Sequence, residues 1–116
     1  MKDVLLIYGN EGQMPMDPNS PETQKVFAAY GAYTEDIQKR GLMKAGEGLQ
    51  PTATATTVRV RNGQRSISDG PFAETKEQLG GFYLVDCKDL DEAIDCAARI
   101  PGAATGSIEV RPVIPM

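Results

Sequence analysis

The chain contains no histidine, and this absence removes several kinds of active site. Without an imidazole there is no histidine-ligated metal centre, no Ser-His or Cys-His nucleophile pair and no histidine acid–base catalysis. The two cysteines, Cys87 and Cys96, cannot supply the four ligands of a zinc site by themselves. We therefore expect no metal and no other cofactor, and any acid–base chemistry would have to use carboxylates.

Clustered positive charge and long apolar runs are also scarce. The net charge is −4, and Lys39-Arg40 is the densest basic pair, which argues against a nucleic-acid surface and against binding to an anionic membrane. The apolar run at residues 4–7 is too short for a signal peptide or a membrane span. We expect a cytoplasmic protein in which Cys87 and Cys96 are small buried residues rather than a disulfide.

The length and composition indicate one ordinary soluble domain. A chain of 116 residues with 41% hydrophobic and 24% charged residues can bury one core made of a sheet and two helices. We therefore expect a single domain over residues 1–116.

The best-defined element is a helix over residues 20–40. Ser20 can cap it, Pro21 suits its first turn and Gly41 can end it in the left-handed conformation. Apolar residues at helical spacing predict one buried stripe, formed by Val26, Phe27, Tyr30, Tyr33 and Ile37.

The other elements follow from alternation, turn residues and caps. Strands are predicted over residues 3–8, 42–49, 54–61, 64–68, 82–85 and 107–113. Asn62-Gly63 predicts a two-residue hairpin turn, and Gly46 and Gly48 predict a bulge or a close approach inside their strand. A second helix begins at Asp89 or Asp91 and stops at Pro101-Gly102. Its apolar positions are Leu90, Ala93, Ile94, Ala97, Ala98 and Ile100.

This order predicts an α+β domain: a ferredoxin-like split β-α-β arrangement with an inserted β-hairpin. The two helices would cover one face of the sheet. The segments 4–7 and 82–85 place apolar side chains on both faces, and only two helices are available. We therefore expect a homodimer that packs sheet against sheet.

Three groups of residues carry a family resemblance that extends over most of the chain. The first is the segment 46–49 (GEGL), the second is 69–77 (DGPFAETKE) followed by 80–82 (GGF), and the third is 91–93 (DEA) with 109–112 (EVRP). On these motifs the chain resembles the YCII-related proteins, in particular the DGPF-domain branch. The resemblance implies a ferredoxin-like domain that dimerises as an α/β barrel.

The resemblance implies less about function. The wider family was proposed to be enzymatic from a His-Asp pair in a cleft, and a dehydrochlorinase of aromatic-ring degradation is similar to it. DGPF proteins are often encoded beside extracytoplasmic-function sigma factors. Because this chain has no histidine, only the aspartate of that pair carries over, and we place it at Asp69.

One interpretation of the loop after Asp69 is a site for a small organic molecule. Asp69, Glu47 and Lys76 would be catalytic, with Asp69 as acid or base, and Tyr8 and Tyr33 could donate to an oxyanion. The reaction would be proton abstraction or elimination. Ligand contacts would come from Gly70, Phe72, Glu74, Glu77, Gly80, Gly81 and Phe82.

The other interpretation is a built turn. Asp69 would then accept hydrogen bonds from nearby backbone, residues 75–78 would form one helical turn, and Gly80-Gly81 would be a bulge. Glu47 would be an exposed strand residue, and Tyr33 would belong to the core. Met14 and Met16 would pack in the first loop or form a mobile lid.

Two functions remain open from the sequence. The first is a cofactor-free enzyme-like or ligand-binding protein, which requires a cleft of about 300 Å³ or more lined by Asp69 and Glu47. The second is a regulatory module that binds a sigma factor, which the gene neighbourhoods of the family suggest.

Overall fold

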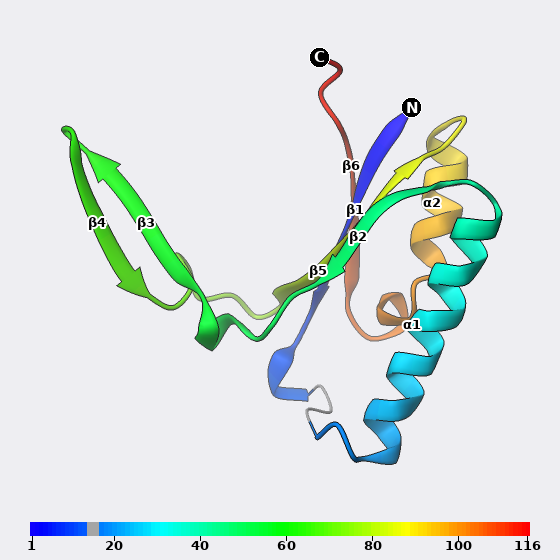
Figure 1. Ribbon diagram of the computed structural model, residues 1–116, viewed down its shortest axis with the longest axis horizontal. Coiled ribbons are helices and arrows are strands. Elements are labelled where there is room, and N and C mark those ends of the chain that lie inside the picture. Colours follow the sequence, from blue (N-terminus) through cyan, green and yellow to red (C-terminus); the bar gives the residue numbers. More distant parts are fainter. Residues whose placement is uncertain (14–16) are drawn as a thin grey trace.

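The computed structural model describes residues 1–13 and 17–116. Four strands form one antiparallel sheet in the order β2 (Met43–Gly48), β5 (Gln78–Asp86), β1 (Lys2–Gly9) and β6 (Ser107–Pro112). Helices α1 (Pro21–Lys39) and α2 (Leu90–Ala98) cover one face of this sheet (Figure 1). The chain is therefore α+β as predicted, and the strand order is compatible with a ferredoxin-like fold. Met14 and Met16 lie outside the described residues.

The inserted hairpin forms a sheet of its own. β3 (Thr56–Arg61) and β4 (Gln64–Asp69) pair with each other and project from the body on the side opposite the helices (Figure 1). The predicted Asn62-Gly63 turn is confirmed by positive φ angles of 53° and 74°. We call this hairpin, residues 56–69, the arm.

Short 3₁₀ segments complete the chain. They are Glu11–Gln13 after β1, Thr52–Thr54 before β3 and Pro101–Ala104 after α2. The side chain of Glu11 accepts hydrogen bonds from the backbone N–H and the hydroxyl of Thr52, at 2.9 and 2.8 Å. This contact joins the loop after β1 to the segment that leads into the arm. Among the described residues, no helix is long and apolar enough to cross a membrane.

The caps of α1 agree with the sequence, but its buried stripe is narrower than predicted. The Ser20 hydroxyl accepts from the Thr23 N–H at 3.1 Å, and Gly41 has φ of 72°. Tyr33 and Ile37 are buried, whereas Phe27 is 66% exposed. The prediction that Phe27 belongs to the buried stripe was therefore wrong. Successive residues are about 100° apart around a helix, which turns Phe27 away from the line that contacts the sheet.

Helix α2 begins at Asp89, whose carboxylate accepts from the Glu92 N–H at 2.9 Å. The Glu92 carboxylate accepts from the Lys88 N–H at 3.0 Å, so one N–H of the first helical turn and the N–H just before the cap both have partners. Ala93, Ala97 and Ile100 are buried as predicted. Three other predicted core positions were wrong, because their side chains are exposed: Leu90, Ile94 and Ala98.

The core lies between the sheet and the helices. Leu5 and Val85 contribute from the two central strands, and Ile37 from α1. Cys87 and Cys96 are buried and free, which confirms their prediction as small core residues. Burial raises the pKa of the Cys87 thiol to about 12, so this thiol stays protonated at neutral pH.

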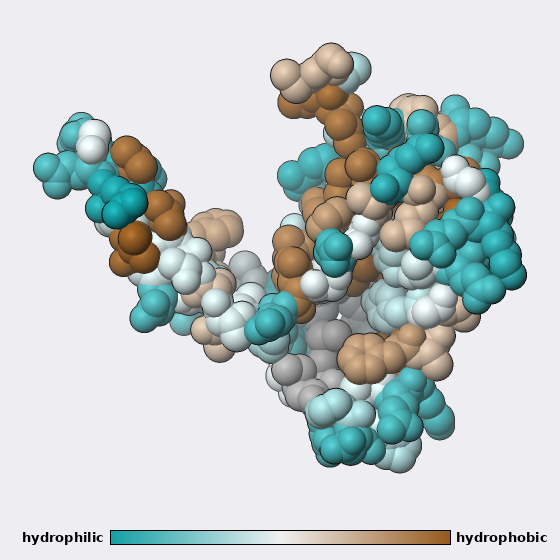
Figure 2. Space-filling model, in the orientation of Figure 1, coloured by the Kyte–Doolittle hydropathy of each residue, from teal (hydrophilic) through white to brown (hydrophobic). Residues whose placement is uncertain are grey.

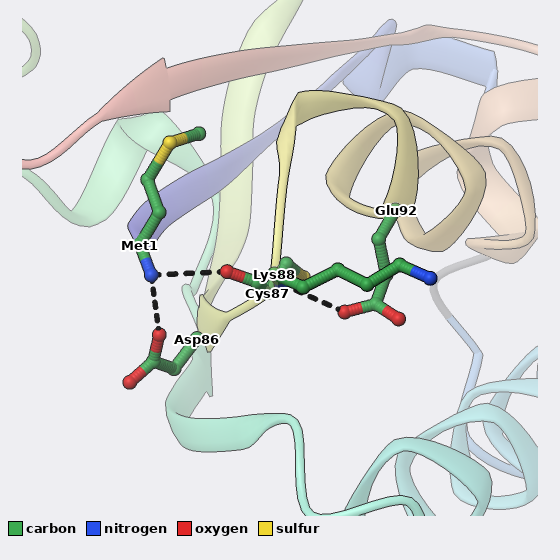
Figure 3. A network of polar contacts seen from close by, with 5 residues as sticks. All are labelled: Met1, Asp86, Cys87, Lys88 and Glu92. Carbon is green, nitrogen blue, oxygen red and sulfur yellow. Dashed lines mark hydrogen bonds and ion pairs between the residues drawn. The ribbon is translucent and has the colours of Figure 1, made fainter.

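The amino group of Met1 closes the end of the sheet that lies next to α2 (Figure 3). It donates to the Asp86 carboxylate at 2.8 Å and to the Cys87 carbonyl at 3.0 Å. The hydrogen bond with Asp86 raises the pKa of the amine above 8.0 and lowers the pKa of Asp86 below 3.8. The amine contributes stability below pH 8 that is lost as pH rises, and Asp86 contributes stability above pH 4 that is lost as pH falls.

Replacing Asp86 with asparagine should therefore cause a small loss of stability that is largest between about pH 5 and 7. The difference from wild type should shrink above pH 8, where the amine loses its proton. Urea unfolding at a series of pH values measures this difference. Glu35→Gln, which removes an exposed pair with Lys39 on α1, is the control and should show no such change near pH 8. A constant difference from pH 5 to 10 would contradict the assignment.

Candidate functional site

Among the described residues, no element covers the face of the sheet opposite the helices (Figure 1). Strand register places Glu47, Phe82, Leu6 and Glu109 opposite one another in one row of this face, and Ala45, Leu84, Val4 and Arg111 in the next row. Each row therefore has two apolar residues at its centre. We call this surface the open face.

The apolar centre of the open face is separate from the core. Its four residues are only partly buried and do not pack against the core cluster: Val4, Leu6, Phe82 and Leu84. At one edge the Glu47 carboxylate is exposed. At the other edge Arg111 donates to both carboxylate oxygens of Glu109, at 2.7 and 2.8 Å, and this hydrogen bond raises the pKa of Arg111.

Glycines allow β2 and β5 to approach closely beside Glu47. A Cβ at Gly46 would lie 2.8 Å from the Tyr83 ring, and one at Gly81 would lie 2.9 Å from the Glu47 carbonyl oxygen. The register also shifts between Met43 and Ala45. The close approach that the glycines predicted is present, whereas the register shift lies before Gly46 rather than at a glycine.

Asp69 lies at the root of the arm, exposed, at the last position of β4 and opposite Thr56. Gly70 follows with φ of 91°, a conformation that favours glycine. The Gly70 N–H donates to the Ala55 carbonyl at 2.7 Å, and its carbonyl accepts from the Thr57 hydroxyl at 2.8 Å. These bonds fix the backbone beside Asp69, while the Asp69 carboxylate stays on the surface.

Alternation places Asp69 on the same face of the arm as its exposed apolar residues. This face carries three successive cross-strand pairs: Thr56 with Asp69, Val58 with Ile67, and Val60 with Arg65. We call it the apolar arm face. The opposite face of the arm carries Thr57, Arg59, Arg61, Gln64, Ser66 and Ser68.

Residues 71–77 form an irregular segment rather than the predicted helical turn. Gln78 already pairs with Gly9 in β5, so the chain cannot wind through it. The segment is held by hydrogen bonds from the Thr75 hydroxyl to the Glu77 carbonyl at 2.6 Å and from the Ser107 hydroxyl to the Glu77 carboxylate at 2.8 Å. Glu74 and Lys76 are exposed, and Phe72 is 78% exposed.

The structure therefore groups the predicted site residues in two places. Glu47, Gly81 and Phe82 adjoin on the open face, and Asp69 and Gly70 adjoin at the root of the arm. Two surface hollows near α2 lie elsewhere. One of about 420 Å³ is lined by Arg40 and charged residues at the start of α2, and one of about 310 Å³ is lined by apolar residues of α2 and β6.

The two tyrosines expected to stabilise an oxyanion have different surroundings. The Tyr33 hydroxyl donates to the Cys96 carbonyl at 2.8 Å inside the core, and burial raises the pKa of Tyr33. Tyr33 is thus a core residue, as the alternative interpretation had it. Tyr8 is half-buried and belongs to the last part of β1, opposite Leu79 and Ser107.

Together these elements define an α+β protein with two helices on one face of an antiparallel sheet and an uncovered opposite face. The YCII-related domain matches residues 1–116, so the chain belongs to the YCII-related family. It is 45% identical over 112 residues to an uncharacterized protein from Rhizobium meliloti (strain 1021). That alignment covers 95% of this chain and 90% of its relative.

The sequence interpretation missed the apolar arm face. The signal was present, because Val58 and Val60 alternate with arginines in β3 and Ile67 alternates with serines in β4. An amphipathic hairpin is expected to bury its apolar face against the body. Here it does not, and Val58, Val60 and Ile67 are exposed.

Proposed function

We propose that the protein is a member of the DGPF branch that binds a small organic molecule and acts on it by carboxylate acid–base chemistry, without a cofactor. The observation that carries this proposal is the position of two exposed carboxylates beside uncovered apolar surfaces. Asp69 adjoins Val58 and Ile67 on the arm, and Glu47 adjoins Phe82 on the sheet. A carboxylate beside apolar surface favours its protonated form more once water is excluded, which suits it to proton transfer at neutral pH.

The chemistry follows from these groups. The carboxylate of Asp69 would take a proton from an acidic C–H bond of the bound molecule, and the electron pair of that bond would remain on the substrate. In one outcome this electron pair is delocalised over the substrate as an enolate or phenolate-like anion. In the other it forms a double bond, and a leaving group departs with the electron pair of its own bond to carbon. The Lys76 ammonium is the cation of the adjoining segment and would attract an anionic substrate. Phe72 and Phe82 would contact the apolar part of the ligand, and the flanking residues Glu74, Glu77, Gly80 and Gly81 would shape its surroundings.

Deuterium incorporation tests the proposal without knowledge of the product. Small phenols, carbonyl compounds and halogenated organic acids would be incubated with the protein in D₂O, and the loss of their C–H signals followed by NMR. We expect exchange in at least one compound class, and Asp69→Asn should slow it by about 100-fold or more. Asp91→Asn removes a carboxylate from the start of α2 and should leave the rate unchanged. Equal rates for wild type and Asp69→Asn, or no exchange in any class, would contradict the proposal.

A further inference from the structure

The apolar arm face is exposed to solvent, and a hairpin with such a face uncovered is only marginally stable. Val58, Val60 and Ile67 are 56%, 59% and 59% exposed. An isolated two-stranded hairpin is marginally stable in water, and it needs a third layer on its apolar face to hold its shape. The radius of gyration is 16.0 Å, against about 13 Å for a compact domain of this length, because the arm stands away from the body.

A second uncovered apolar surface borders the same space. The open face lies on the side of the sheet from which the arm projects (Figure 1). Figure 2 shows that the space between arm and body stays open when all side chains are drawn, with hydrophobic residues along the arm and along the adjoining side of the body. Both surfaces therefore lack a covering layer, and one occupant of that space would cover both.

The arm as a whole and the remainder of the chain carry opposite net charges, and Arg59 and Arg61 lie on the face of the arm opposite the apolar one. The arm holds Arg59, Arg61 and Arg65 against a single carboxylate, Asp69, so the arm carries +2 and the remainder of the chain −6 of the total −4. Arg65 lies on the apolar arm face beside Val60. The open face has an exposed carboxylate, Glu47, at its β2 edge. A positive arm with an apolar stripe thus matches a negative body with an apolar centre.

We propose that the occupant is a second copy of this chain, and that the arms are exchanged. In the homodimer the apolar arm face of each copy lies on the open face of the other. Two-fold symmetry makes this contact reciprocal, so one arrangement covers both arms and both sheets. In this arrangement the two sheets face each other with the arms between them, rather than in direct contact.

Arm exchange has a consequence for the site, which rests on the proposed function. Asp69 shares a face with Val58 and Ile67, so in the arm-exchanged dimer it would face the partner copy. Each site would then combine Asp69 of one copy with Glu47 and Phe82 of the other. Neither of the two hollows near α2 is lined by Asp69 or Glu47, in keeping with a site that needs both copies.

Molar mass tests the interface with two neighbouring substitutions. Ile67→Glu places a charge on the apolar arm face, and Ser66→Glu places the same charge on the opposite face of the same strand. Both positions are exposed and outside the core, so both variants should fold. Light scattering at micromolar concentration should give twice 12.5 kDa for wild type and Ser66→Glu, and 12.5 kDa for Ile67→Glu. A monomeric wild type, or a dimer that Ile67→Glu leaves intact, would overturn the proposal.

A photo-crosslinker at Val58 tests whether the arm contacts the partner. Benzoylphenylalanine at this position, in an equimolar mixture of ¹⁴N- and ¹⁵N-labelled chains, should give mixed-isotope peptides that join the arm to β1 or β5. If every crosslinked pair of peptides from the arm and β1 or β5 carried a single isotope, the arm would contact its own sheet. That result would contradict exchange.

Complementation tests the shared site separately. Asp69→Asn and Glu47→Gln chains should each be inactive as homodimers. A random mixture should regain about one quarter of the wild-type activity, because half of the dimers are mixed and each mixed dimer has one intact site. No recovery, with both parents inactive and wild type active, would place the two carboxylates in separate or single-chain sites. If wild type shows no activity, the proposed function fails while the masses and crosslinks still decide the interface.

Discussion

Alanine at Gly106 is expected to destabilise the fold by about 3 kcal/mol, lowering the melting temperature by about 10 °C or more. Gly106 lies between the 3₁₀ turn Pro101–Ala104 and strand β6, and its N–H donates to the Gly102 carbonyl at 2.8 Å. A Cβ there would overlap the carbonyl oxygen of Tyr8 in the neighbouring strand. The overlap is with backbone, so no side-chain rotation relieves it, and β6 has to move away from β1.

The matched control is Gly31→Ala. Gly31 lies inside helix α1, and an added Cβ would meet no atom within 4 Å. This variant should gain about 0.5–1 kcal/mol from the higher helix propensity of alanine. Urea unfolding followed by circular dichroism measures both changes. If Gly106→Ala were as stable as wild type, the close pairing of β1 with the start of β6 would be wrong.

Valine at Asp3 is expected to stabilise the protein by about 2 kcal/mol. Asp3 is fully buried in β1, and neither of its carboxylate oxygens has a hydrogen-bond partner among the described residues. A buried carboxylate without a partner costs free energy, and valine suits a strand position opposite Val85 and Pro112.

Asp3→Asn provides the graded comparison. It removes the charge but leaves a buried polar group without a partner, so it should recover less stability than Asp3→Val. If this explanation holds, equilibrium urea unfolding should give the highest free energy of unfolding for Asp3→Val, then Asp3→Asn, then wild type. A loss of stability in Asp3→Val would mean that the carboxylate has a favourable partner in the assembled protein.

The local rules of the sequence predicted the elements of the fold well. Ser20 and Gly41 mark the ends of α1 through side-chain capping and a left-handed backbone, and Asn62-Gly63 forms the predicted turn. Each of these features depends only on residues close in sequence. The strand order follows from the succession of elements, because split β-α-β units connect in few ways.

Predictions that depended on what covers a surface were less successful. Phe27, Leu90 and Ile94 fit helical periodicity, yet they are exposed because the contact with the sheet is narrower than the apolar stripe. The buried carboxyl group of Asp3 breaks the apolar pattern of β1, and no local rule predicts it. Asp69 and Glu47 were expected to line one cleft, but within the described chain they lie in two places, at the root of the arm and on the open face. The sequence gives no direct sign that the arm leaves the body.

The central claim is that the site lies between two copies and that the arm forms it. Native mass spectrometry of freshly purified wild type, beside Ile67→Glu and Ser66→Glu, tests this claim most directly because it reports subunit number and retained small molecules together. We predict a dimer with a retained small molecule for wild type and Ser66→Glu, and an empty monomer for Ile67→Glu. A wild-type monomer, or a monomeric Ile67→Glu that keeps the molecule, would contradict the claim.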